Sequence, residues 1–330
     1  MIPESTETIL ITGGTGFAGR HLIKALEKPG RVIHVIDRTR IAARGEYWAD
    51  AGMQLHMMDL THPEGLRELV GRIRPTRVFH LAGRANVKHS WHGESETYTA
   101  NVIGAVNLLC ALRDTDCEAD TLIVSSGEVY GWVSEDDQPI DETRMPSPRS
   151  PYAASKYCQE IACLQIARSL KGKVVVVRPF NHIGPGQRLG FVTADFANQV
   201  ARIENGRQLP VIRVGNLESR RDFTDVRDTV AGYIEALACG QPGDVINVCS
   251  GHAFRIQDFL DYFLEKSRCR ITVEVDPNRF RPADVPLLTG NPARLERISG
   301  WAARRSITDT LDEILDYWRF HVDDTDTTDE

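Results

Sequence analysis

Tyr152 and Lys156 have a spacing that suits proton transfer. Side chains four residues apart lie on one face of a helix, about one turn from each other. An ammonium group within about 4–6 Å of a phenol favours the phenolate and lowers the pKa of the phenol from about 10. Tyr152 is therefore a candidate acid or base. The spacing alone is weak evidence, because an amphipathic helix with a lysine reaching toward solvent also shows it.

Ser126 is a third candidate for the same site. It follows the apolar run 121–125, which is typical of a buried strand. Ligands of open α/β sheets bind at the carboxyl ends of the strands, so we expect the Ser126 hydroxyl to face the ligand. A hydroxyl, a phenol and an ammonium group together indicate a hydride-transfer site, which requires a cofactor.

A glycine-rich turn near the N-terminus predicts the site of that cofactor. Gly13, Gly16 and Gly19 are spaced three apart, with Phe17 between them. A strand-like run precedes the turn and a helical run follows it, as a dinucleotide-binding motif requires. In such a turn the backbone amides approach a pyrophosphate at a helix N-terminus, where the helix dipole favours negative charge. We therefore expect NAD or NADP as cofactor.

Residues that follow the next strands would complete the cofactor site. Asp37 lies 18 residues after Gly19, where an acidic side chain binds the adenosine ribose and favours NAD. Arg38 follows at once, and an arginine there accommodates the 2′-phosphate of NADP. We expect Asp59 and Leu60 to flank the adenine, although a helix cap and core packing explain them equally well. The small-residue turn after the fourth strand-like run adds two candidates, Leu81 and Ala82.

Apolar runs alternate with helical stretches along the chain, which predicts a parallel sheet. We expect an α/β fold, a Rossmann-type doubly wound parallel sheet with a smaller mixed α/β substrate lobe. The dinucleotide-binding domain would comprise residues 1–181 with 221–250, and the smaller lobe residues 182–220 with 251–320. The acidic segment 321–330 is nearly free of apolar residues, so we expect disorder there. The strand-like runs are 8–12, 32–36, 53–57, 77–81, 120–125, 173–180 and 244–249.

Composition narrows the class of protein. With 330 residues and 42% hydrophobic content, the chain can bury a large core. A net charge of −7 argues against binding of nucleic acid or of acidic membranes. No apolar run approaches the roughly 20 residues of a membrane span, and the N-terminus lacks a signal pattern, so we expect a cytoplasmic protein. The seven cysteines form no Cys-x-x-Cys pair and the histidines show no metal-ligand spacing, so we expect reduced cysteines and no metal.

Several of these motifs, in this order, resemble the extended short-chain dehydrogenase/reductase family of nucleotide-sugar epimerases, dehydratases and reductases. The resemblance covers nearly the whole chain. Within the family, the runs 148–152, 178–187, 213–218 and 221–228 are most similar to GDP-4-keto-6-deoxy-D-mannose reductases, which form GDP-D-rhamnose. The motifs shared with the wider family are the glycine turn at 13–19, His80–Ala82, Asn101, the trio of Ser126, Tyr152 and Lys156, and Arg178–Pro179.

The resemblance implies a reaction and a set of substrate ligands. The reaction is NAD(P)H-dependent reduction of the C4 ketone of a GDP-4-keto-6-deoxy-hexose, with Tyr152 as proton donor. The matching positions imply that Asn181 contacts the diphosphate or the sugar and that Val192 lies beside the base. Arg221 and Arg281 would grip the diphosphate, because the fixed fork of a guanidinium meets phosphate oxygens in pairs. Asp284 would bind the ribose.

Other activities within the family share the same trio. A 4,6-dehydratase needs a base and usually a hydrogen-bonding or acidic side chain next to it. Glu128 occupies the position of that base, whereas Gly127 beside it offers no side chain. Dehydratase and 4-epimerase therefore remain alternatives, and a non-catalytic dinucleotide-binding sensor or scaffold is an alternative of another class. The intact trio argues against the last.

The helix that carries Tyr152 has apolar residues around much of its circumference, including Ile161. This pattern indicates a second buried face beyond the one that faces the site. Members of the family often dimerise through this helix and the helix that holds Asn101. We therefore expect a homodimer.

Overall fold

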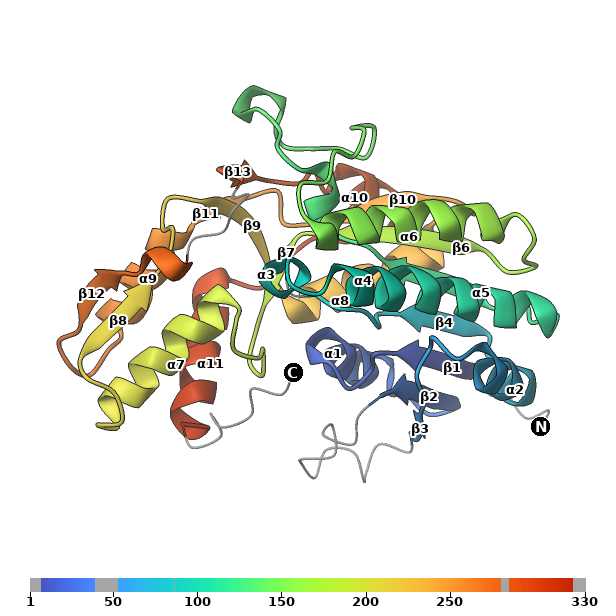
Figure 1. The fold of residues 1–330 in the computed structure, drawn as a ribbon, viewed down its shortest axis with the longest axis horizontal. Coiled ribbons are helices and arrows are strands. Elements are labelled where there is room, and N and C mark those ends of the chain that lie inside the picture. Colours follow the sequence, from blue (N-terminus) through green and yellow to red (C-terminus); the bar gives the residue numbers. More distant parts are fainter. Residues whose placement is uncertain (1–6, 39–52, 86, 280–284, 323–330) are drawn as a thin grey trace.

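The computed structural model describes residues 7–38, 53–85, 87–279 and 285–322, and its centre is a parallel sheet of seven strands (Figure 1). All seven predicted strand-like runs contribute to it, which confirms the Rossmann-type fold. Consecutive buried side chains, as in Val174–Val177, suit strands that are covered on both faces. The strands, in spatial order, are β10 (Val245–Val248), β6 (Val174–Pro179), β5 (Asp120–Val124), β4 (Arg77–His80), β1 (Glu7–Thr12), β2 (Arg31–Asp37) and β3 (Gln54–Met57).

Helices cover both faces of this sheet (Figure 1). One face packs against α1 (Phe17–Leu26), α8 (Val226–Cys239) and α10 (Ala293–Ser299) through an apolar cluster. The other face packs against α2 (Pro63–Ile73), α5 (Gly104–Asp114) and α6 (Pro151–Ala167) through a second cluster. The strands that follow β1 extend the sheet first on one side and then, from β4 onward, on the other. Ligands of such sheets bind where the strand order reverses, so we expect them at the carboxyl ends of β1 and β4.

A smaller mixed α/β region lies at the carboxyl ends of the large sheet. Helices α7 (Val192–Glu204), α9 (Ile256–Glu265) and α11 (Ile307–Phe320) pack around a third apolar cluster. Strands β8 (Val211–Val214) and β12 (Thr272–Val275) pair in parallel. A second small sheet contains β7 (Asn181–Ile183), β9 (Arg220–Asp225), β11 (Ala253–Arg255) and β13 (Leu287–Leu288).

Three details differ from the predicted division of the chain. Helix α10 was assigned to the smaller lobe, but Leu295 is buried against the large sheet and α8, so the helix belongs there. Strand β9 was assigned to the larger domain and pairs instead within the small sheet. The predicted tail begins later than residue 321, because Val322 is buried in the third cluster. Residues 323–330 lie outside the described residues.

The glycine turn between β1 and α1 depends on the absence of side chains. Gly13 has a φ of +69°, which favours glycine, and a Cβ there would lie 2.7 Å from the backbone nitrogen of Ala82. A Cβ on Gly19 would lie 2.5 Å from the carbonyl oxygens of both Gly13 and Gly14. The backbone of α1 therefore packs directly on the backbone of the turn, and the turn packs directly on the backbone that follows β4.

We predict that Gly19→Ala destabilises the protein by about 1–3 kcal/mol, because its methyl group meets backbone that must move. Gly71→Ala in α2 is the matched control, since a Cβ there is at least 3.4 Å from its neighbours. Alanine in that helix should add up to about 1 kcal/mol of stability. Urea unfolding measures both free energies, and equal values for the two variants would contradict the prediction.

Candidate active site

Helix α6 places Tyr152 and Lys156 at the carboxyl end of β5. Its N-terminus is fixed by Ser150, whose Oγ accepts a hydrogen bond of 3.1 Å from the backbone nitrogen of Ala153, and by a proline in the first turn. The backbone nitrogen of Tyr152 donates a further hydrogen bond of 3.2 Å to Oγ of Ser90. The helix and the one-turn separation of the pair agree with the sequence analysis.

Tyr152 lies in a buried environment beside Ser126 and Glu128. Burial raises the pKa of the Tyr152 phenol to about 12, a nearby Glu128 carboxylate acts in the same direction, and a hydrogen bond with Ser126 opposes both. Ser126 is the second residue after β5 and caps a short 3₁₀ turn, its Oγ accepting from the backbone nitrogen of Glu128 at 3.2 Å. The three side chains predicted for catalysis at this point therefore meet.

Lys156 is almost completely buried and points toward the sheet. Its Nζ donates to the carbonyl oxygen of Val124 at 2.8 Å and to Oε1 of Gln159 at 3.0 Å. Burial lowers the pKa of Lys156 to about 8. The expectation that this ammonium lowers the pKa of Tyr152 is wrong for the structure: the lysine side chain is directed to β5, and burial of the phenol dominates.

Asn101 links the turn after β4 to helix α6. It lies in a π-helical turn (Thr99–Ile103) between α4 (Glu94–Tyr98) and α5, and it is fully buried. Its Nδ2 donates to Oγ of Ser155 at 2.8 Å, and its Oδ1 accepts from the backbone nitrogen of Arg84 at 2.8 Å. Asn101 belongs to a motif shared with the family, but the sequence alone predicts no role for it in the site.

The predicted cofactor residues lie at the carboxyl ends of neighbouring strands. Asp37 ends β2, and its carboxylate accepts hydrogen bonds from Oγ1 of Thr15, in the glycine turn, and from the backbone nitrogen of Arg38. The guanidinium of Arg38 lies 3.8 Å from the carboxylate of Asp59, after β3. Burial acts to raise the pKa of Asp59, but hydrogen bonds from Thr61 and the charge of Arg38 outweigh it and lower the pKa.

The remaining predicted cofactor residues surround the turn. Phe17 begins α1, and its ring stacks on His182 with centroids 5.9 Å apart, which joins the turn to the segment after β6. Leu81 and Ala82 directly follow β4, and both backbone nitrogens donate to Thr12. Leu60 is buried in the second apolar cluster, so core packing accounts for its side chain.

The cradle of backbone formed by the glycine turn and Ala82 fits a dinucleotide, because a Cβ at Gly13 or Gly19 would fill it. An acidic residue and an arginine stand at the end of β2, as recognition of an adenosine ribose requires. These observations agree with an NAD(P) site at the end of β1 and β2.

Three predicted substrate residues lie on elements of the smaller region. Asn181 begins β7, which pairs with β9, and the side chain of Arg221 on β9 is buried. The guanidinium of Arg221 donates to the carbonyl oxygen of Arg220 at 2.9 Å. Val192 begins α7 and packs against the third apolar cluster. Arg281 and Asp284 lie outside the described residues.

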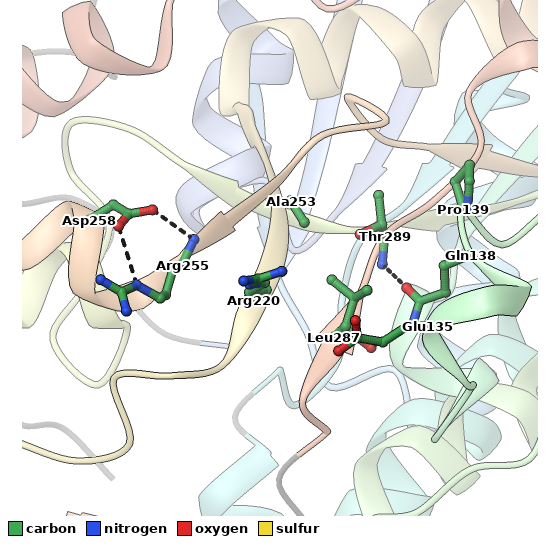
Figure 2. Close-up of a pocket in the computed structure, with 9 residues that line it drawn as sticks. All are labelled: Glu135, Gln138, Pro139, Arg220, Ala253, Arg255, Asp258, Leu287 and Thr289. Carbon is green, nitrogen blue, oxygen red and sulfur yellow. Dashed lines mark hydrogen bonds and ion pairs between the residues drawn. The ribbon is translucent and has the colours of Figure 1, made fainter.

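A cleft of about 550 Å³ lies on the face of the second small sheet that carries Arg220 and Leu287 (Figure 2). In the register of β13 with β9, Leu287 pairs with Arg220 and Leu288 with Arg221. Because neighbouring residues of a strand point to opposite faces, the cleft and Arg221 lie on opposite sides of that sheet. The cleft is therefore not part of the hydride-transfer site. It is lined by Glu135, Gln138, Pro139, Arg220, Ala253, Arg255, Asp258, Leu287 and Thr289.

The described residues contain no cluster of three or more histidine, cysteine, aspartate or glutamate side chains that could hold a metal ion. All seven cysteines are described, and none forms a disulfide. Within the same part of the chain, no helix combines the length and the apolar character needed to cross a membrane.

The parallel sheet, the glycine turn and the Ser126, Tyr152 and Lys156 trio define an NAD(P)-dependent enzyme of the extended short-chain dehydrogenase/reductase class. The profile of one family, described as GDP-mannose 4,6 dehydratase, matches residues 10–314. The chain belongs to that family.

Named relatives agree with this assignment. The chain is 36% identical to the GDP-6-deoxy-D-mannose reductase of Pseudomonas aeruginosa, an alignment that covers 96% of this chain and 99% of the relative. The structure of RMD from Pseudomonas aeruginosa complexed with NADPH superposes with a TM-score of 0.83 and 35% identity, covering 96% of this chain and all of that one (100%). The UDP-glucose 4-epimerase of Thermus thermophilus in complex with NAD gives 0.83 at 29% identity, covering 94% and 99%.

We predict that the ammonium of Lys156 titrates near pH 8 in the protein without cofactor, because burial disfavours its charge. The Cε resonance of each lysine in NMR spectra reports this, and the signal that is missing from Lys156→Arg identifies the residue. A midpoint near the ordinary value of 10.5 would contradict the burial that the structure shows.

Proposed function

We propose that the protein catalyses NAD(P)H-dependent reduction of the C4 ketone of GDP-4-keto-6-deoxy-D-mannose to GDP-D-rhamnose. The observation that carries this proposal is the packing around Gly127. A Cβ at that position would lie 3.0 Å from the ring of Phe180, which is itself buried. The site thus has the groups for hydride transfer, but a second side chain beside Ser126, which elimination usually requires, would need the Phe180 ring to move. The name of the Pseudomonas aeruginosa relative supports the same reaction.

The protonation states of the buried groups suit reduction. With a pKa of about 12, the Tyr152 phenol holds its proton at neutral pH and can donate it to the oxygen of the ketone. Ser126 hydrogen-bonds the same oxygen and stabilises the charge that develops there. With a pKa of about 8, Lys156 is mostly charged at neutral pH, and its ammonium would orient the ribose of the bound nicotinamide. When bound, the nicotinamide supplies the hydride to C4.

The cofactor would be held by the residues around the glycine turn. Gly13, Gly16 and Gly19 allow the backbone to approach the pyrophosphate, and Asp37 binds the adenosine ribose. Arg38 has an exposed side chain and serves a 2′-phosphate, which supports use of NADPH as well as NADH. The other residues proposed for this site are Phe17, Asp59, Leu81, Ala82, Tyr152 and Lys156, whereas the side chain of Leu60 packs in the core.

The nucleotide sugar would occupy the side of the small sheet on which Arg221 lies. There Asn181 and Arg221 meet the diphosphate, and Val192 at the start of α7 lies beside the base. We extend this set to Arg281 and Asp284 from the family resemblance alone. A GDP-sugar is the substrate that the family description and the reductase name support.

GDP-mannose 4,6-dehydratase is the alternative that a specific residue favours. Glu128 lies close enough to Tyr152 for its charge to raise the pKa of the phenol, so a carboxylate is present where a dehydratase carries its base. The two activities differ in what they consume. Purified protein should therefore be incubated with GDP-mannose alone, and separately with GDP-4-keto-6-deoxy-D-mannose and NADPH or NADH. Loss of GDP-mannose in the first reaction would overturn the reductase proposal, whereas cofactor oxidation only in the second would support it.

We predict that Tyr152→Phe lowers kcat by roughly two to four orders of magnitude, because it removes the proton donor. Cofactor affinity should stay within about twofold, since the ring is retained and a lost neutral hydrogen bond contributes little. Tyr157→Phe is the matched control on the same helix, because its hydroxyl donates to the sulfur of Met145 at 3.8 Å and not to a residue of the trio. Absorbance of NADPH follows the rate, and near-normal turnover of Tyr152→Phe would remove Tyr152 from this role.

We further propose that the protein acts in the cytoplasm as a homodimer, joined through α6 and the helical segment that contains Asn101. Support for the dimer comes from apolar side chains exposed on neighbouring helices: Ile161 on α6 is 55% exposed and Ile103 is 45% exposed. The packing of α5 beside α6 brings the two segments to one face (Figure 1). A shared apolar face of this kind suits a two-fold interface.

We predict that Ile161→Glu converts the dimer to a monomer, because two buried carboxylates would face each other across the axis. Leu209→Glu is the control, since Leu209 is also exposed, at 79%, but lies away from α6. Multi-angle light scattering measures the mass, and a wild-type mass near 37 kDa at all micromolar concentrations would refute the proposed dimer.

A further inference from the structure

Glu160 is a buried carboxylate that the proposed reaction does not use. It lies one helical turn beyond Lys156 on α6 and is 2% exposed. Its Oε1 accepts hydrogen bonds from Oγ of Ser125 and from Nε of Arg178 at 3.0 Å, and its Oε2 accepts from NH2 of Arg178 at 2.7 Å. The carboxylate is thus fully engaged, and it takes no part in cofactor or substrate chemistry.

Three successive turns of α6 hold three successive residues at the end of β5. Tyr152 interacts with Ser126, Lys156 donates to the carbonyl oxygen of Val124, and Glu160 accepts from the hydroxyl of Ser125. Ser125 and Ser126 are neighbours in the chain. Holding Ser125 against the helix therefore limits the movement of the backbone that carries the Ser126 hydroxyl.

Arg178 makes the carboxylate a rigid anchor. Its forked pairing with Glu160 fixes two N–H groups at once, a geometry that single ammonium groups do not provide. The guanidinium lies over the ring of Tyr130, 4.8 Å from its centroid, and the Tyr130 hydroxyl donates to Oδ1 of Asn247 at 2.8 Å. The anchor for Ser125 is thereby tied to β6, to the 3₁₀ turn after Ser126 and to β10.

We propose that Glu160, held by Arg178, is a positioning residue for hydride transfer: it fixes Ser125 so that the Ser126 hydroxyl faces Tyr152. This inference rests on the proposed function, because Ser126 and Tyr152 are assigned their roles there. Displacement of a reacting group by about 1 Å can cost on the order of 100-fold in rate, so such an anchor affects kcat without touching the substrate.

The negative charge of Glu160 also supports the charge of Lys156. Burial lowers the pKa of Lys156 to about 8, and the charges of Cys163 and Glu160 oppose that shift. From the facing strand β4, His80 is the other titratable group near the ammonium, and it is neutral because burial lowers its pKa to about 3. Tyr152, the last titratable neighbour on α6, keeps its proton at neutral pH. Removing the Glu160 charge therefore lowers the pKa of Lys156 further.

The sharpest test is Ser125→Ala, which removes the link to Ser126 and leaves the Glu160 and Arg178 pair intact. With GDP-4-keto-6-deoxy-D-mannose and NADPH, kcat should fall roughly tenfold and KM should stay within about twofold. Thr121→Val is the matched control, because it removes a buried hydroxyl at the far end of the same strand. Equal kcat values for Ser125→Ala and the wild type would overturn the proposal.

Glu160→Gln tests the charge. Its pH profile of kcat/KM should lose activity on the alkaline side at lower pH than the wild type, because Lys156 gives up its proton earlier. Glu204→Gln is the control, since the Glu204 side chain is also 2% exposed and forms the same forked pair with Arg319, at 2.9 Å for both contacts, in the smaller region. Both variants should lose Tm, but only Glu160→Gln should shift the alkaline limb. An unshifted limb, or the same shift in both, would contradict the proposal.

A failure of the anchor is distinguishable from a failure of the proposed function. If the wild-type protein reduces none of the keto sugar, the proposed function fails before any variant is compared. The anchor is then tested by unfolding alone, in a double-mutant cycle of Ser125→Ala and Glu160→Gln. Losses of Tm that are not additive would support the contact, and strictly additive losses would overturn it. Should Glu160→Gln not fold, the cycle is run with Glu160→Asp.

Discussion

The attachment of α6 to the carboxyl end of β5 is the contact on which the rest of the site depends. Lys156 and Glu160 each bind a residue at the end of that strand, and Tyr152 meets the next residue along. The helix therefore has one register relative to the sheet. Because β5 lies two strands from β1, the same register sets the distance between Tyr152 and the glycine turn. The proposed proton donor and the proposed cofactor site are thus positioned by a single packed interface.

Burial decides the chemistry of this interface more than charge pairing does. It raises the pKa of the phenol to about 12 and lowers that of the ammonium to about 8, so at neutral pH the protein without ligand holds a protonated Tyr152 beside a largely charged Lys156. That is the state from which a ketone is reduced. The buried carboxylate of Glu160 opposes the loss of charge on Lys156 without entering the reaction. The contact of Gly127 with Phe180 limits the same pocket sterically.

Much of the fold follows from patterns that a single segment carries. Runs such as Val174–Val177 are apolar on both faces, a pattern that is typical of strands covered on both faces. The Tyr152 and Lys156 pair follows from helical spacing, and the glycine turn from its flanking elements. The pKa of Tyr152 did not follow, because burial depends on segments far apart in sequence. The pairing of Glu160 with Arg178 and the packing of Phe180 on Gly127 were not predicted either, because each joins two different elements of the fold. The prediction that α10 belongs to the smaller lobe was wrong, because Leu295 packs in the apolar cluster that contains α8.

The central claim is net reduction at C4, and isotope transfer tests it most directly. Purified protein is given GDP-4-keto-6-deoxy-D-mannose and NADPH in which both hydrogens at C4 of the nicotinamide are deuterium, and the sugar nucleotide is analysed by NMR and mass spectrometry. The account predicts one deuterium at C4 of a GDP-6-deoxyhexose, with one equivalent of cofactor oxidised for each product. A product without deuterium at C4, or with deuterium at C6, would contradict it.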